Sequence, residues 1–153
     1  GPATRYPSAI VVNGLRGGQI EKVTVSMRIA YPKPEDLDIL LVGPNNTGVV
    51  LMSDAGGTTS SSEDLIFDQD APGVLPDVLV SGVYQPSNYP VALDAFPAPA
   101  PGGISGHSLT AFNGENPNGE WQLFINDDED SVQDGGGALG GWSITIRARI
   151  RVR

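Results

Sequence analysis

Hydrophobic and polar residues alternate along several stretches of this chain, with the period of two that is typical of β-strands with one buried face. In residues 22–31, K-V-T-V-S-M-R-I-A-Y, valine, methionine and isoleucine side chains share one face. The same alternation predicts strands at residues 37–42, 49–53, 121–126 and 142–152, and residues 43–48, G-P-N-N-T-G, predict a turn. The sequence offers no stretch with three turns of apolar residues at helical spacing. The pattern therefore predicts an all-β domain.

A proline-rich middle interrupts this alternation. Residues 68–106 are rich in proline and include the stretch F-P-A-P-A-P at residues 96–101. Proline blocks pairing within a sheet and favours the extended polyproline II conformation. Because neither flank has enough strands for a sandwich of its own, we expect a single domain over residues 3–153, with a surface insertion at about residues 60–105. Gly1-Pro2 is typical of the remnant that tag removal leaves.

Length and composition exclude several classes of protein. The chain has 153 residues, close to the ~150 residues expected of one domain. Its apolar runs are far shorter than the ~20 residues that span a bilayer, so we expect no membrane span. The sequence lacks cysteine, which excludes disulfides, thiolate metal sites and a cysteine nucleophile. His107 is the single histidine, which leaves little room for histidine-based catalysis.

The charges are distributed unevenly along the chain. The net charge is −9, which argues against nonspecific binding of nucleic acid. Residues 34–146 contain neither lysine nor arginine, and they hold every acidic residue except Glu21. Two interpretations stay open, namely a solvated acidic surface and carboxylates that a bound cation neutralises. The four arginines at the end of the chain, with Arg28, are expected on one sheet face, either as solvated side chains or as an anion-binding stripe.

Several short motifs occur in a recognisable order. They are I-E-K-V-T-V at residues 20–25, E-D-L-D-I-L-L-V-G-P at 35–44, V-L-M-S-D at 50–54, F-N-G at 112–114, N-G-E-W at 118–121 and G-G-W-S-I-T-I at 140–146. Together they resemble the P domain, or homo B domain, which follows the catalytic domain in kexin- and furin-like proprotein convertases and in many bacterial subtilisin-like proteases. The resemblance covers roughly residues 10–54 and 105–150.

The resemblance implies a jelly-roll-like β-sandwich of about eight antiparallel strands without an active site. It further implies an accessory role in a secreted or cell-surface bacterial protein, in which the domain stabilises or contacts a neighbouring domain such as a subtilisin-like serine protease. Two features depart from the family pattern. Glu35 stands where the family usually has glycine, and the segment at about residues 60–105 is longer than in the convertases. A long insertion of this kind is similar to the variant in bacterial multidomain surface proteins.

The inventory of reactive side chains predicts a domain that is not an enzyme. A Ser-His-Asp triad would have to use His107, in the loop S-G-H-S, and the sequence has no Gly-x-Ser-x-Gly nucleophile elbow. Glu120 beside Trp121 suits glycoside hydrolysis by residue type alone. The sequence places no second carboxylate opposite it.

Carboxylates near one predicted hairpin are the best candidates for chemistry. If Val42 faces Gly48, then Asp36 faces Asp54, and Asp38 lies on the same face. Opposed side chains have Cβ atoms ~5 Å apart, and two carboxylates at that distance repel by about 3 kcal/mol at an effective dielectric constant of about 20. A hard cation would relieve this repulsion.

Oxygen ligands without histidine or cysteine favour Ca²⁺. The resemblance adds a carboxylate from the end of the Trp121 strand, so the predicted ligands are Asp36, Asp38, Asp54 and Asp127. The alternative is that Asp36 and Asp54 cap turn amides and stay solvated. The acidic run at residues 127–134 lacks the spacing of a helical Ca²⁺ loop and is interpreted as a solvated loop.

The aromatic residues suggest a second function. Trp121 and Trp142 share the parity of the apolar residues in their strands, so we expect both in the core. Tyr84, Tyr89 and Phe96 lie in the proline-rich segment and are candidates for an exposed partner-binding surface. The alternative function is therefore an independent glycan- or protein-binding module of a surface protein.

Overall fold

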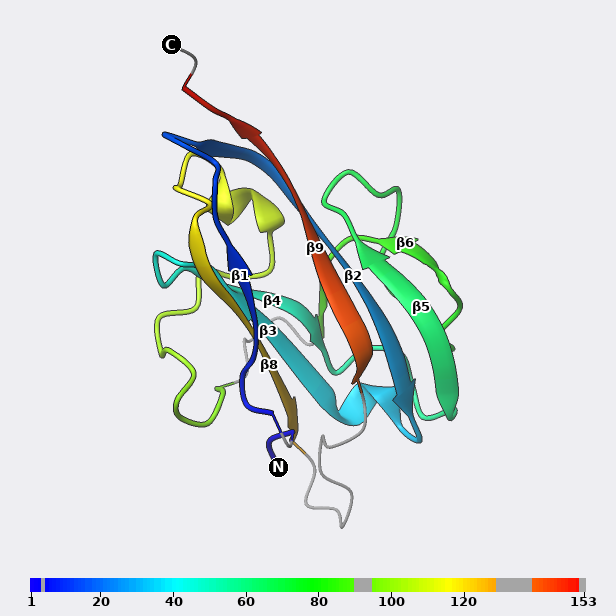
Figure 1. Cartoon of the computed structure of the whole chain (residues 1–153). Helices are drawn as coiled ribbons and strands as arrows, with labels where there is room; N and C mark the ends of the chain where they lie inside the picture. Colours follow the sequence, from blue (N-terminus) through cyan, green and yellow to red (C-terminus); the bar gives the residue numbers. More distant parts are fainter. Residues whose placement is uncertain (4, 90–94, 129–138, 152–153) are drawn as a thin grey trace.

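The fold is a sandwich of two β-sheets (Figure 1). The computed structural model describes residues 1–3, 5–89, 95–128 and 139–151. The five-stranded sheet has the order β1-β8-β3-β4-β7, and the four-stranded sheet has the order β6-β5-β2-β9. The strands are β1 (Ser8–Val12), β2 (Gln19–Tyr31), β3 (Leu37–Val42), β4 (Gly48–Ser53), β5 (Ser61–Phe67), β6 (Gly82–Tyr84), β7 (Ser87–Asn88), β8 (Gly119–Asp127) and β9 (Leu139–Arg149). Two short 3₁₀ helices, η1 (Pro34–Asp36) and η2 (Leu109–Phe112), accompany them.

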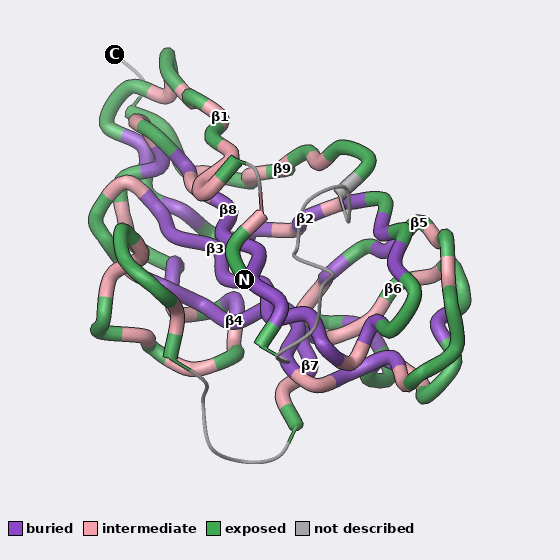
Figure 2. Tube along the Cα trace, turned by 90° about the horizontal axis from the view of Figure 1, so that it is seen from below, coloured by how far each residue is buried: buried purple, intermediate pink, exposed green. Residues whose placement is uncertain are grey.

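The main core lies between the two sheets. Alternate residues of β2 pack against the inward-facing residues of β3 and β8, which include Leu37, Ile39 and Trp121. Figure 2 shows these buried residues concentrated on β2, β3, β4 and β8. The alternation in the sequence therefore has its expected physical cause, because each strand turns its apolar face towards the opposite sheet.

A second apolar cluster lies on the outer face of the five-stranded sheet. Leu40, Val42, Val50 and Phe124 form it. The proline-rich segment covers this face with Phe96, Ala100 and Ile104, and Tyr6 packs on Phe124 with ring centroids 4.9 Å apart. Burial raises the pKa of Tyr6 to about 12. Because both faces of the sheet are covered here, every residue of β3 and β4 is buried.

Most of the predicted strands are confirmed, whereas β1, β5, β6 and β7 were not predicted. The strands predicted from residues 22, 37, 49, 121 and 142 correspond to β2, β3, β4, β8 and β9. Residues 61–67 form β5, which pairs with β2, although they were expected to begin a surface insertion. The pairs β4–β7 and β5–β6 are parallel, whereas an antiparallel sandwich was expected. No helix among the described residues is long and apolar enough to cross a membrane.

Candidate metal centre

A row of polar side chains crosses the end of the outer face of the five-stranded sheet. Asn126 in β8 pairs with Asp38 in β3, Asp38 pairs with Ser53 in β4, and Ser53 pairs with Asn88 in β7. Asp38 has the parity of Leu40, and Asn126 has the parity of Phe124, so both side chains lie on the outer face. The Ser53 hydroxyl donates a hydrogen bond to Asp38 Oδ1 at 2.8 Å.

A β-bulge in β4 brings Ser53 to this face. The register shifts between Ile39 and Leu40, so Leu51 and Met52 both pack into the main core. The extra residue reverses the parity of Ser53 relative to an unbroken strand. Without the bulge, Ser53 would point between the sheets.

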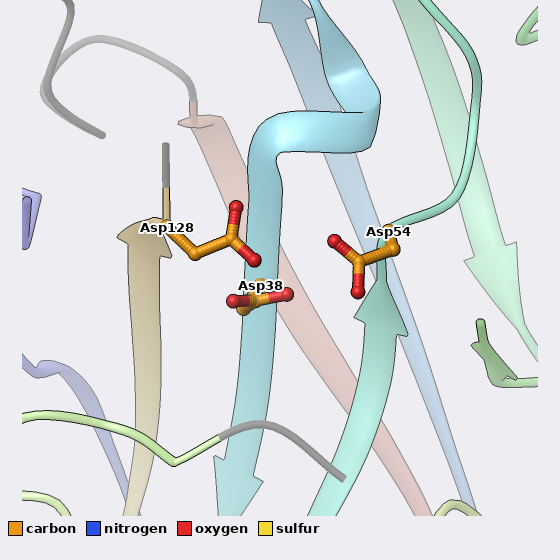
Figure 3. A group of neighbouring side chains, drawn as sticks. All are labelled: Asp38, Asp54 and Asp128. Carbon is orange, nitrogen blue, oxygen red and sulfur yellow. The ribbon is translucent and has the colours of Figure 1, made fainter. Parts of the chain in front are cut away.

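The carboxylate of Asp54 joins the row from the turn that follows β4. Its φ of 52° lies in the left-handed region, which is uncommon for a residue other than glycine. Asp54 and Asp128 approach Asp38 from opposite sides, as Figure 3 shows. One oxygen from each of the three carboxylates lies within 4.8 Å of the other two. Two carboxylates at that separation repel by about 3 kcal/mol at an effective dielectric constant of about 20.

The structure brings Asp38 and Asp54 together but directs the other two predicted ligands elsewhere. The predicted register was wrong for the residues before Leu40, because the bulge places Asp38 opposite Ser53 and gives Asp36 no partner in β4. The Asp36 carboxylate lies 3.2 Å from Lys33 Nζ. Asp127 has the inward parity of β8, and it accepts a hydrogen bond from the Tyr31 hydroxyl at 2.5 Å. Metal binding by any of the four stays a prediction.

Asn126 and Asp128 were not among the four predicted ligands, because Asp127 was chosen at this end of the strand and Asp128 was interpreted as part of a solvated loop. Both flank Asp127, and both have the outward parity of Phe124. The alternation of Trp121, Leu123 and Ile125 in the sequence was the signal that separates them from Asp127. The Asp128 amide donates to the Asp36 carbonyl at 3.0 Å, which fixes the end of β8 beside β3.

The remaining candidates are spread over the molecule. His107 and Glu120 are exposed. The Tyr84 hydroxyl donates to the Val80 carbonyl at 2.6 Å, Phe96 packs on the outer cluster, and Tyr89 is 42% exposed. Trp121 is fully buried, as expected, and Trp142 is half-buried. Residues 129–134 of the acidic run lie outside the described residues.

A second charged cluster lies beside a pocket between β2 and η2. Lys22 Nζ lies 2.6 Å from Asp70 Oδ2 and 2.9 Å from Asp68 Oδ1. These hydrogen bonds, the one to Asp70 first, raise the pKa of Lys22. The hydrogen bond from Lys22, with one from the Asp70 amide, lowers the pKa of Asp68. The pocket has a volume of about 170 Å³, and Arg147 also lines it.

The lowered pKa of Asp68 predicts that the domain loses stability as the solution becomes acidic. A carboxylate with a depressed pKa in the folded state stabilises the protein above its ordinary pKa of about 4, and this contribution is lost as the pH falls further. Asp68→Asn is therefore expected to lower the free energy of unfolding by about 0.5–1 kcal/mol at pH 7. The difference from the unmodified protein should shrink when the pH is lowered from about 7 to below that ordinary pKa. Urea denaturation at both pH values measures it. Asp70→Asn, at a side chain 79% exposed, should have the smaller effect, and equal losses at both pH values would contradict the expectation.

Comparison with known proteins relates this framework to a family. Residues 20–71 match the family model of the proprotein convertase P-domain. The resemblance to the P domain is confirmed. The match contains Asp38 and Asp54, whereas Asn126 and Asp128 lie beyond it. No curated protein matches the chain.

The comparison with solved structures found two matches, both to a serine protease of Aeromonas sobria. A crystal structure of an Aeromonas sobria serine protease in complex with the chaperone ORF2 aligns with a TM-score of 0.52 and 16% identity. The alignment covers 99% of this chain and 24% of the matched chain, so this chain spans about a quarter of the length of that protein. A structure of the serine protease of Aeromonas sobria aligns over 85% of this chain and 18% of the other, with 17% identity and a TM-score of 0.41.

Proposed function

We propose that this chain is a non-catalytic accessory domain of a secreted bacterial serine protease. In this proposal it contacts and stabilises a neighbouring protease domain of the same protein, and a bound calcium ion contributes to its own stability. The P-domain match of residues 20–71 is the observation that carries the proposal. The fold similarity to about a quarter of a chain in a serine protease–chaperone complex supports it.

The outer face of the β5–β6 pair is the candidate contact surface. Ile66 and Val83 are register partners on these strands, and they are 39% and 44% exposed. Val80, close by in sequence, is 57% exposed. Adjacent exposed apolar side chains at the edge of a sheet are typical of surfaces that another domain covers.

Expression of the full reading frame, with and without residues 3–153, tests the accessory role. We expect removal of the domain to lower the yield of active secreted protease at least ~10-fold, because a domain held by few kcal/mol loses most of its folded population when an interface disappears. A reading frame with Ile66→Asp and Val83→Asp should show a smaller loss. The isolated domain should hydrolyse no peptide. A reading frame without a protease domain, or full activity after the deletion, would refute the proposal.

An independent glycan- or protein-binding module is the second candidate function. Tyr89 favours it, since this residue is 42% exposed, whereas Phe96 packs against the outer cluster. A glycan array probed with the purified domain, with Tyr89→Ala as control, distinguishes the two functions. Binding that Tyr89→Ala abolishes would favour the module, and an array without signal would count against a glycan ligand.

A further inference from the structure

An unsatisfied amide oxygen belongs to Asn126, the residue of β8 that pairs with Asp38 of the carboxylate group. Asn126 is 7% exposed, and its Oδ1 has no hydrogen-bond partner among the residues that the structure describes. Its register partner is Asp38, and both side chains lie on the outer face of the sheet. Buried amide oxygens in native proteins are almost always paired, with ordered water or a bound ion where the protein supplies no donor. We therefore expect a bound water or ion beside the side-chain oxygen of Asn126.

The neighbouring carboxylates make that partner a cation. Asp38, Asp54 and Asp128 bring oxygens within 4.8 Å of one another. Oxygens that bind one Ca²⁺ at 2.3–2.6 Å lie at most about 5 Å apart, so the spacing fits a single ion. A bound metal ion would give the Asn126 oxygen a partner. It would also neutralise part of the negative charge of the three carboxylates.

We infer that Asp38, Asp54, Asp128 and the carbonyl oxygen of Asn126 bind one Ca²⁺ ion. The inference rests on the proposed stabilisation by calcium and adds its ligands and its selectivity. Ser53 orients the site, because its hydroxyl holds Asp38 Oδ1 at 2.8 Å. The inferred ligand set leaves out Asp36 and Asp127, since Lys33 and Tyr31 engage their carboxylates.

The ligand set favours Ca²⁺ over Mg²⁺. Its ligands are carboxylate and amide oxygens at the ends of β3 and β8 and on the residues that directly follow β4 and β8. Ca²⁺ accepts six to eight such oxygens in irregular geometry, whereas Mg²⁺ demands a near-ideal octahedron and retains several waters. The ion ties the end of β8 and the turn after β4 to the start of β3. Its binding energy therefore stabilises the folded state.

Calorimetric titration and thermal melts of the metal-free domain test the inference. We expect one Ca²⁺ per chain, a rise in Tm of about 5–10 °C at 100 times the Kd, and a much smaller rise with Mg²⁺. Asp128→Asn and Asn126→Ala should each weaken Ca²⁺ binding at least ~10-fold. Asp36→Asn is the matched control and should bind Ca²⁺ as the unmodified domain does.

The Asp128→Asn variant has a second signature that a purely structural role would not produce. Without metal it should melt slightly above the unmodified domain, because one repulsive charge is gone. With Ca²⁺ it should melt below it. This variant is on an exposed residue, so it keeps the test valid if Asn126→Ala fails to fold.

The outcomes separate this inference from the proposed function. If Ca²⁺ at millimolar concentration leaves the Tm of the unmodified domain unchanged, both the site and the stabilisation by calcium are refuted, while the accessory role stands on the deletion experiment. If Ca²⁺ raises the Tm equally in Asp128→Asn and Asn126→Ala, calcium stabilises the domain from another place and the ligand assignment is refuted.

Discussion

Trp121→Ala is expected to lower the free energy of unfolding by about 3–5 kcal/mol, as other deletions of a buried aromatic side chain do. The ring is fully buried, and it packs edge-on against Phe112 with centroids 5.0 Å apart. Its Nε1 donates to the Pro117 carbonyl at 2.9 Å, so the substitution also leaves a buried acceptor without its donor. A domain of this size has a total stability of roughly 5–15 kcal/mol. Urea denaturation followed by circular dichroism measures the loss.

The second tryptophan provides the matched control. Trp142 is half-buried, and its Nε1 donates to the Ser8 hydroxyl at 3.0 Å. Trp142→Ala should therefore cost distinctly less than Trp121→Ala, since it removes less buried surface and leaves no large cavity. Equal losses for the two variants would mean that the core between the sheets is not centred on Trp121.

The regular strands of the sandwich could be predicted because their physical cause is local. In residues 23–29 of β2 the apolar residues that face the opposite sheet alternate with polar ones, and this alternation is visible in the sequence. Strand β5 escaped prediction, because it begins with S-S-E-D and only its end carries Leu65 and Phe67 into the core. Its place beside β2 is fixed by pairing over a long sequence separation, which no short window contains.

The candidate metal centre could be predicted only in part, for two different reasons. Asn126 and Asp128 were accessible to the sequence, since parity along β8 places them on the face of Phe124 and turns Asp127 inward to Tyr31. The bulge beside Leu51 was not accessible. A bulge changes the face of every later residue in the strand, and the continuous apolar run V-V-L-M at residues 49–52 gives no local sign of it. The predicted register of this hairpin was therefore correct near the turn and wrong at the open end.

Gly57→Ala is expected to destabilise the domain by at least ~2 kcal/mol, because the backbone there has both a left-handed conformation and a tight contact. The φ of Gly57 is +67°, and an added Cβ would lie 1.9 Å from the Asp77 carbonyl oxygen. A backbone oxygen cannot move aside as the end of a flexible side chain does. The Gly57 carbonyl also accepts the Glu35 amide at 3.0 Å, which joins this turn to the start of η1.

The same substitution reaches the proposed calcium site through the chain. Asp54 lies three residues before Gly57, and the turn between them sets the approach of its carboxylate to Asp38. Thermal melts of Gly57→Ala should therefore show a lower Tm and a smaller gain from Ca²⁺. Gly73→Ala is the matched control, because an added Cβ there meets no atom within 4 Å and the φ of Gly73 is outside the left-handed region. That variant should match or slightly exceed the unmodified stability, since alanine restricts the unfolded chain. Equal behaviour of the two variants would show that the turn after β4 tolerates displacement, and the geometry that brings Asp54 to the site would then lose its support.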